Sequence, residues 1–89
     1  MSVYVDDIAA PFGRMVMCHM LADSTEELLT MADTIGVARQ WIQDAGTPRE
    51  HFDISKGKRA LAVQAGALEV TGKDLARVII QKRAGVGLR

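Results

Sequence analysis

The segment RMVMCHMLADSTEELLTMADTIG, residues 14–36, carries the strongest structural signals of the chain. Residues 14–21 are apolar on both alternating faces, which is typical of a strand that is covered on both sides. Residues 24–35 predict a helix, because Ser24 can cap it, Glu27 follows three residues later, and apolar residues recur at helical spacing. Gly36 is suited to end this helix in the left-handed conformation. A buried strand that leads directly into an amphipathic helix indicates an α/β fold.

Further elements are expected on both sides of this segment. Residues 3–5 predict a first strand, and the turn after it, marked by Pro11 and Gly13, is too short for a parallel crossover. This strand should therefore pair antiparallel with residues 14–21. The later elements are strands over residues 51–54 and 67–70, a helix over residues 56–65 capped by Ser55, and a helix from Thr71 to the glycines at 85 and 87.

The resulting order is β-β-α-β-α-β-α. Strands that are joined through a helix usually run parallel, so we expect a mixed, mostly parallel four-stranded sheet with helices packed on it. Residues 1–89 then form a single small α/β domain.

Length and composition limit the classes of protein. A chain of 89 residues, 48% hydrophobic and 25% charged, is an ordinary globular domain. Because a domain this small buries only about 65% of its unfolded surface, we expect a homo-oligomer. No apolar run approaches the roughly 20 residues of a membrane span, and acids stand where a signal peptide has bases, which predicts a cytoplasmic chain without a membrane partner. One Cys and two His exclude an internal disulfide and a Cys/His zinc cage within one copy.

The charges are divided along the chain although their sum is zero. Residues 1–55 hold nine acids and three bases, and residues 56–89 hold eight bases and two acids. Either the two halves neutralise each other across a contact, or part of the basic half faces an anionic ligand.

The start of the helix at residue 56 is the main candidate for an anion site. Lys56, Lys58 and Arg59 place three cations in a first turn, where the helix dipole favours anions. Either Glu50 and Asp53 compensate them, or a phosphate binds there. The residues predicted to contact such a ligand, near the starts of the second and third helices, are Ser55, Lys56, Arg59 and Lys73. Because neither GxxxxGK[ST] nor GxGxxG occurs, an ordinary P-loop or Rossmann site is excluded.

Carboxylates and histidines form a second group of candidates. Asp6, Asp7 and Asp23 are candidate metal ligands, although Asp6 and Asp7 are expected at the opposite sheet edge from Asp23 and Asp53. Asp7 can instead form an ion pair with Arg14 across the turn.

The two histidines have both structural and chemical interpretations. His19 is either a core residue with one hydrogen-bond partner or a ligand contact. His51 shares a strand face with Asp53, a spacing that suits a metal ion or an acid/base pair. Cys18 points away from His19 on a strand, which excludes a Cys/His nucleophile pair. Trp41 is expected to pack, with an interface or base-stacking role as the alternative.

Several motifs together resemble an uncharacterised domain-of-unknown-function family of bacteria and their phages. They are Tyr4-Val5-Asp6-Asp7, Pro11-Phe12-Gly13-Arg14-Met15, Met17-Cys18-His19-Met20, Ala22-Asp23, His51-Phe52-Asp53-Ile54 and Lys58-Arg59-Ala60. The resemblance implies no established chemistry, but it marks a set of polar positions: Asp6, Asp7, Arg14, His19, Asp23, His51, Asp53 and Arg59. The presence of the family in phages implies a counter-defence or regulatory role. The chain departs from the family pattern at Ile42, which replaces a Phe, and in its longer loop over residues 44–50.

Three hypotheses follow. The leading one is a non-catalytic module that binds a small anionic, nucleotide-like ligand without a cofactor, with Arg14, His19, His51, Asp53, Ser55, Lys56, Arg59 and Lys73 as contacts. The second is a metal-dependent phosphodiesterase or nuclease that uses Mg²⁺ or Mn²⁺ at clustered Asp and His residues. The third is a structural subunit with an exposed apolar patch and no site. Sequence-specific recognition of nucleic acid is not expected, because no RNA-binding motif is present.

Overall fold

The computed structural model describes residues 2–8, 10–12 and 15–87, and β3 (Met15–Ala22) is its central strand. β1 (Val3–Val5) and β2 (Ala10–Phe12) both pair antiparallel with β3 along one edge. β4 (Phe52–Ser55) pairs antiparallel with the other edge, and β5 (Leu68–Glu69) adds to β1 as the single parallel pair. The sheet is therefore mixed, with β3 in its middle.

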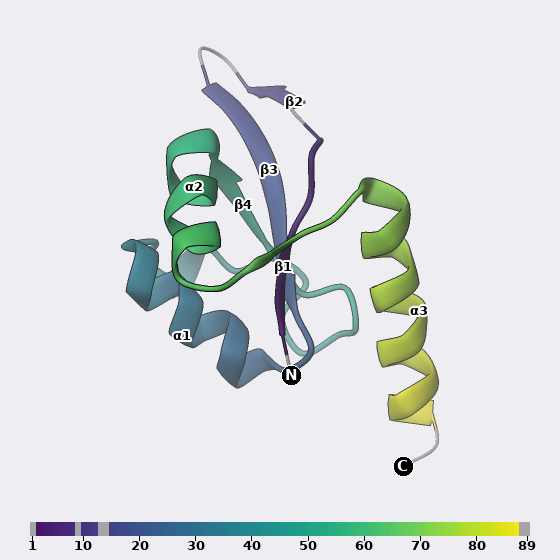
Figure 1. Cartoon of the computed structure of the whole chain (residues 1–89). Helices are drawn as coiled ribbons and strands as arrows, with labels where there is room; N and C mark the ends of the chain where they lie inside the picture. Colours follow the sequence, from purple (N-terminus) through teal and green to yellow (C-terminus); the bar gives the residue numbers. More distant parts are fainter. Residues whose placement is uncertain (1, 9, 13–14, 88–89) are drawn as a thin grey trace.

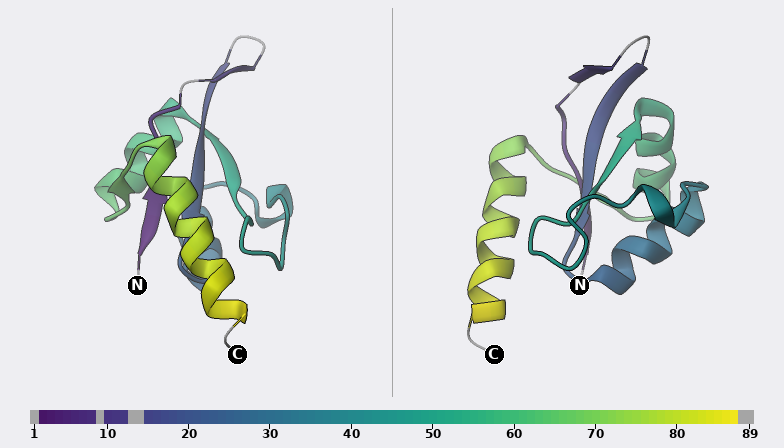
Figure 2. Two further views of the ribbon diagram at one scale, coloured as in Figure 1. Left: turned by 90° about the vertical axis from the view of Figure 1, so that its right-hand side faces the viewer. Right: turned by 180° about the vertical axis from the view of Figure 1, so that it is seen from behind.

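Three helices cover the two faces of this sheet. α1 (Thr25–Ile35) and α2 (Lys56–Gln64) lie on one face, and α3 (Gly72–Gly87) lies on the other (Figure 1). A short 3₁₀ turn, η1 (Arg39–Trp41), follows α1. From behind, the loop between η1 and β4 lies on the same side of the sheet as α3 (Figure 2). The predicted α/β class is confirmed, and the elements follow the expected order β-β-α-β-α-β-α with one addition. The addition is β2, which forms in the segment predicted as a turn and makes the sheet five-stranded.

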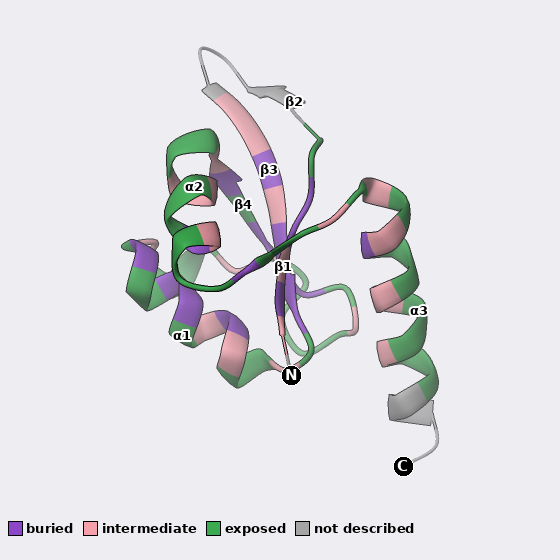
Figure 3. Ribbon diagram, in the orientation of Figure 1, coloured by how far each residue is buried: buried purple, intermediate pink, exposed green. Residues whose placement is uncertain are grey.

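Alternation along the strands separates a core face from a polar face, because successive side chains of a strand point to opposite sides. Cys18 and Met20 of β3 and Phe52 and Ile54 of β4 are buried against α1 and α2. The residues between them, including His19 and Asp53, point to the face of α3. Figure 3 shows buried residues concentrated in the strands and α1, and few in α3.

The predicted helix after β3 forms with the expected caps. The Ser24 hydroxyl accepts a hydrogen bond from the Glu27 N–H, and Gly36 ends the helix at a φ of 79°. Lys58 Nζ donates to the Ile35 carbonyl at 2.8 Å, so a cation of α2 satisfies the last turn of α1. Ser55 caps α2 as predicted, with its hydroxyl accepting from the Lys58 N–H.

The expectation of mostly parallel strands is wrong for β4, which runs antiparallel to β3. The 11 residues of α1 extend about 16 Å, and the loop over residues 36–51 returns the chain to the end of β3, where Phe52 pairs with Met20. β4 therefore starts beside the end of β3. Only β5 has the parallel arrangement, and its partner is β1.

Two smaller expectations also differ. α3 continues through Gly85 to Gly87, because a glycine lowers helix stability without forcing a helix end. Trp41 is 64% exposed and does not pack in the core. Within residues 2–8, 10–12 and 15–87, no helix is both long and apolar enough to cross a membrane.

Candidate functional site

His19, His51 and Asp53 form a cluster on the face of the sheet that α3 covers. His19 and Asp53 lie opposite each other in the antiparallel register of β3 and β4. His51 immediately precedes β4 and bridges to Gln43. One ligand atom of each of the three residues lies within 4.8 Å of the others.

His19 is oriented by Asp6. The Asp6 carboxylate is fully buried and accepts two hydrogen bonds from His19, one from the backbone N–H at 2.9 Å and one from Nδ1 at 2.7 Å. A carboxylate is only an acceptor, so Nδ1 of His19 carries the proton. His19 Nε2 then faces Oδ1 of Asp53 at 3.6 Å.

His51 and Asp53 are oriented in the same way by other groups. Nδ1 of His51 donates to the Arg49 carbonyl at 2.8 Å, which leaves Nε2 directed at Asp53 Oδ1 at 3.6 Å. The second carboxylate oxygen of Asp53 accepts from the Gln43 side-chain amide at 2.7 Å. The two imidazole rings lie edge to face, with centroids 5.6 Å apart.

These contacts bring three acceptor atoms together. Because each Nδ1 carries a proton, each imidazole in its neutral form would present an unprotonated Nε2 to the same carboxylate oxygen. Three such atoms repel one another unless a cation lies between them. Tetrahedral ligands about 2.0–2.1 Å from a zinc ion are about 3.3 Å apart, close to the 3.6 Å between Asp53 Oδ1 and each Nε2.

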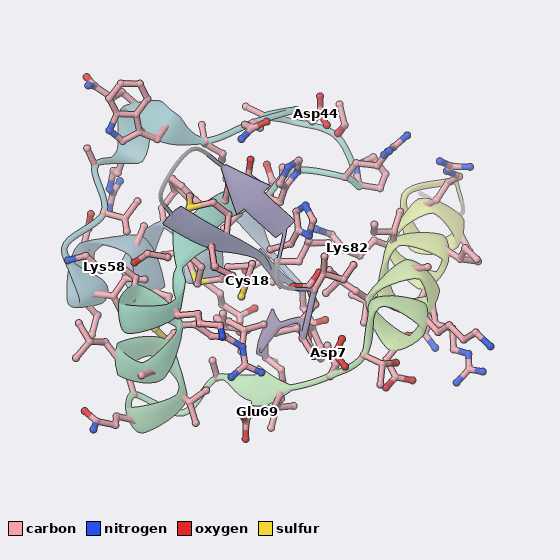
Figure 4. The ribbon with its side chains drawn as sticks, turned by 90° about the horizontal axis from the view of Figure 1, so that it is seen from above. Asp7, Cys18, Asp44, Lys58, Glu69 and Lys82 are labelled. Carbon is pink, nitrogen blue, oxygen red and sulfur yellow. The ribbon has the colours of Figure 1, made fainter. Side chains whose placement is uncertain are left out.

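The other predicted metal ligands do not join this cluster. Asp23 accepts from the Ser2 N–H and the Tyr4 hydroxyl near the start of β1. Asp7 is exposed and lines a different cavity, with Lys56 and Arg59. Figure 4 shows Asp7 and Glu69 at one end of the molecule and Asp44 at the other.

The expectation that Asp6 and Asp53 lie at opposite edges is wrong. Both carboxylates contact His19, because the antiparallel β4 places Asp53 in the middle of the sheet. Arg14, the predicted partner of Asp7, lies outside the described residues.

Two of the three cations at the start of α2, Lys58 and Arg59, have internal partners other than those expected. Arg59 donates through Nε to the Asp6 carbonyl and through a terminal nitrogen to Glu69, at 2.8 and 2.9 Å. Lys58 donates a hydrogen bond to the Ile35 carbonyl at the end of α1. Ser55 is the helix cap, whereas Lys56 and Lys73 are exposed. Arg59 therefore also fixes the backbone that carries Asp6.

The arginine ion pairs found among the described residues are local. Arg39 pairs with Asp33, Arg59 with Glu69, and Arg77 with Asp74. Each pair lies within one half of the chain, so these pairs do not neutralise the two halves against each other.

Burial shifts the pKa values of three titratable groups outside the cluster, Tyr4, Cys18 and Lys82. Burial raises the pKa of the Cys18 thiol, and the nearby Asp6 carboxylate acts in the same direction. Burial lowers the pKa of the Lys82 ammonium, against the opposing attraction of Glu50 and Asp23. Cys18 is thus a core thiol.

Sequence reasoning missed two contributors to the site, Gln43 and Arg49. Both lie in the long loop before β4, and each acts on a residue of the cluster. The His51-x-Asp53 spacing was a visible signal for the ligands, but no local pattern marks the residues that orient them.

The comparisons with known proteins identify a family and no chemistry. Residues 3–82 match the model of a family described as protein of unknown function, DUF4031. Neither a curated protein nor a solved structure matches the chain.

Proposed function

Because the chain belongs to the DUF4031 family, whose description assigns no activity, its function has to be argued from its own side chains, and we propose that it is a metal-dependent phosphoester hydrolase. The metal ion is held by Nε2 of His19, Nε2 of His51 and Oδ1 of Asp53. The observation that carries this proposal is the convergence of these three acceptor atoms with both Nδ1 protons already donated elsewhere.

The surroundings of the three ligands support a metal ion. In metal sites, a ligating histidine commonly donates its other N–H to a carboxylate or a backbone carbonyl, which fixes the ring and its tautomer. Asp6 does this for His19, and the Arg49 carbonyl does it for His51. Gln43 holds the remaining oxygen of Asp53. The site therefore has both its ligands and the groups that orient them.

The donor set indicates which ions fit. Two imidazoles and one carboxylate suit Zn²⁺, Fe²⁺, Ni²⁺ or Mn²⁺ better than Mg²⁺, which prefers oxygen ligands and retained water. Three protein ligands leave coordination positions open, as in catalytic metal sites. A metal ion held in this way supplies a Lewis acid and a hydroxide nucleophile at neutral pH.

Metal binding is the first test. The chain is freed of metal with a chelator and titrated calorimetrically with Zn²⁺, Mn²⁺ and Mg²⁺, and Co²⁺ absorption reports the ligand geometry. We expect one equivalent of Zn²⁺, weaker Mg²⁺ binding, and loss of Zn²⁺ binding in His51→Ala and Asp53→Ala. Asp33→Asn is the control, because this exposed carboxylate pairs with Arg39 away from the cluster.

Hydrolysis is the second test. Release of p-nitrophenol from p-nitrophenyl phosphate and from its bis ester is expected with the metal-loaded chain, and to disappear in His51→Ala. A chain that binds no metal ion stoichiometrically, with the two histidines charged instead, would overturn the proposal. Metal binding without hydrolysis would overturn the enzymatic part alone.

An anion-binding module at the starts of α2 and α3 is a second proposal, with a regulatory or counter-defence role in phage-infected bacteria. It is supported by the exposed Lys56 and by a cavity of about 350 Å³ that Lys56 and Arg59 line with Asp7. ADP affinity that is unchanged in Lys56→Glu and Arg59→Glu would overturn it.

Self-association is also a proposal. It is supported by exposed apolar side chains at Ile8, Trp41, Leu61, Leu68 and Ile80. Light scattering after size-exclusion chromatography measures the subunit number directly, and a monomer at all concentrations would overturn it.

A further inference from the structure

A cavity of about 320 Å³ borders the histidine cluster beneath α3. His19 and His51 line one wall, and Ile8, Leu75 and Ile79 line the opposite wall. Arg49 is the only lysine or arginine among its described lining residues. Resting on the proposed function, we infer that this cavity binds a small organophosphate, whose anionic group faces the metal ion and Arg49 and whose apolar group lies against α3.

The charge distribution of the cavity favours an anionic ligand. Arg49 forms no ion pair with any carboxylate in the part of the chain that the structure describes, and its side chain is exposed. The Asp6 carboxylate, which also lines the cavity, is buried and fully used by His19. Arg49 is therefore the cationic side chain among the described lining residues of the cavity, and guanidinium groups suit phosphate oxygens.

The opposite wall favours an apolar group on the same ligand. Ile8, Leu75 and Ile79 offer aliphatic surface and no hydrogen-bonding side chain. This wall is held in place where α3 begins, because a Cβ on Gly72 would come within 3.0 Å of Ile8 Cδ1. The close approach of Gly72 thus sets the distance between Ile8 and the first turn of α3.

Size and charge count argue for a small molecule rather than a nucleic acid. Ligand pockets range over about 300–1,000 Å³, so this cavity is near the lower end. Proteins that bind a nucleic-acid backbone use a row of cations and stacking aromatic side chains. The described lining residues include one arginine and no Phe, Tyr or Trp.

The test uses phenylphosphonate and inorganic phosphate as probes. Each is titrated into the full chain, with and without one equivalent of Zn²⁺, while the methyl signals of Leu75 and Ile79 are followed by NMR. We expect phenylphosphonate to shift both residues and to bind about tenfold more tightly than phosphate, because the ring buries apolar surface. Arg49→Gln should weaken phenylphosphonate binding about threefold or more. Arg77→Gln is the matched control, since Arg77 lies on α3, is 73% exposed and does not line the cavity.

The outcomes separate this inference from the proposed function. Absence of shifts at Leu75 and Ile79, or an Arg49→Gln affinity equal to that of Arg77→Gln, would overturn the inference even if Zn²⁺ binds normally. Conversely, Arg49-dependent binding of phenylphosphonate to a chain that takes up no Zn²⁺ would support the cavity and overturn the metal site.

Discussion

Asp6 and His19 form a two-point contact, in which one buried carboxylate accepts both the backbone N–H and the Nδ1–H of the same histidine. This contact fixes the backbone and the ring of His19 together. It also explains why a carboxylate with no exposed surface is present in a small domain, since each oxygen has a donor. The first prediction tests this relationship.

Asp6→Asn should lower Zn²⁺ affinity about 10- to 100-fold while the three ligands remain. An amide offers one acceptor oxygen where His19 presents two donors, so either the ring or the backbone loses its partner. Calorimetric titration measures the effect. Asp7→Asn, at the exposed neighbour, should bind like the wild type, and equal affinities in both variants would contradict the role of Asp6.

Gly36→Ala and Gly57→Ala should change stability in opposite directions. Gly36 has a φ of 79°, and an added Cβ would lie 3.2 Å from Lys58 Nζ, so alanine should cost about 1 kcal/mol. Gly57 lies within α2, where an added Cβ meets Ser55 Oγ at an ordinary 3.9 Å, so alanine should stabilise by about 0.5–1 kcal/mol. Urea unfolding of both variants checks the signs, and a stabilising Gly36→Ala would refute the strain at that position.

Phe52→Ala should destabilise the domain by about 3–5 kcal/mol, because Phe52 is fully buried between the sheet and its helices. Domains are stable by only about 5–15 kcal/mol in total, so this variant should be close to unfolding. Chemical denaturation followed by circular dichroism measures the loss. Leu61→Ala, at a side chain that is 45% exposed, should change stability by about 0.5 kcal/mol or less.

Lys82→Met should stabilise the fold at neutral pH. Lys82 Nζ is shielded from solvent and has no hydrogen-bond partner in the described part of the chain. Removing it should gain about 1 kcal/mol, which corresponds to about 4–8 °C in Tm for a domain of this size.

The difference in unfolding free energy between the wild type and Lys82→Met should depend on pH. Burial lowers the pKa of Lys82 in the folded chain below its unfolded value, so the unfolded chain binds more protons between the two values. Wild-type stability should therefore rise relative to Lys82→Met as the pH increases through that window. Unfolding free energies of both proteins at about pH 7 and about pH 10 measure this difference. Lys73→Met, at an exposed lysine on the same helix, is the matched control for this comparison.

Local signals were enough to predict the elements, but not the direction of β4. Ser24, Glu27 and Gly36 specify a helix through contacts with their own neighbours, and these contacts form as expected. The direction of β4 depends on the path of the loop over residues 36–51, which no short pattern encodes. Because that direction decides whether Asp53 faces His19, the composition of the site could not follow from the sequence either.

Part of the candidate site could nevertheless be predicted from the sequence. The spacing of His51 and Asp53 predicted that both side chains share a strand face, and both do contribute to the cluster. His19 had two interpretations, a core residue or a ligand contact. It is half-buried, its Nδ1 has a fixed partner and its Nε2 faces the cluster, and a ligand contact stays a prediction. Asp6 could be recognised as a candidate, but its pairing with His19 arises only from the register of β1 and β3.

The alternation of β3 also constrains how this protein can evolve. Substitutions at Cys18 or Met20 alter packing against α1 and α2, while His19 keeps its orientation, so the hydrophobic interior and the polar cluster can drift independently. Insertion or deletion of a single residue within the strand would exchange the two faces, turning Cys18 or Met20 toward Asp53 and burying the imidazole. A point substitution along this strand therefore affects one face at a time, whereas a change in the length of the strand disrupts the core and the cluster together.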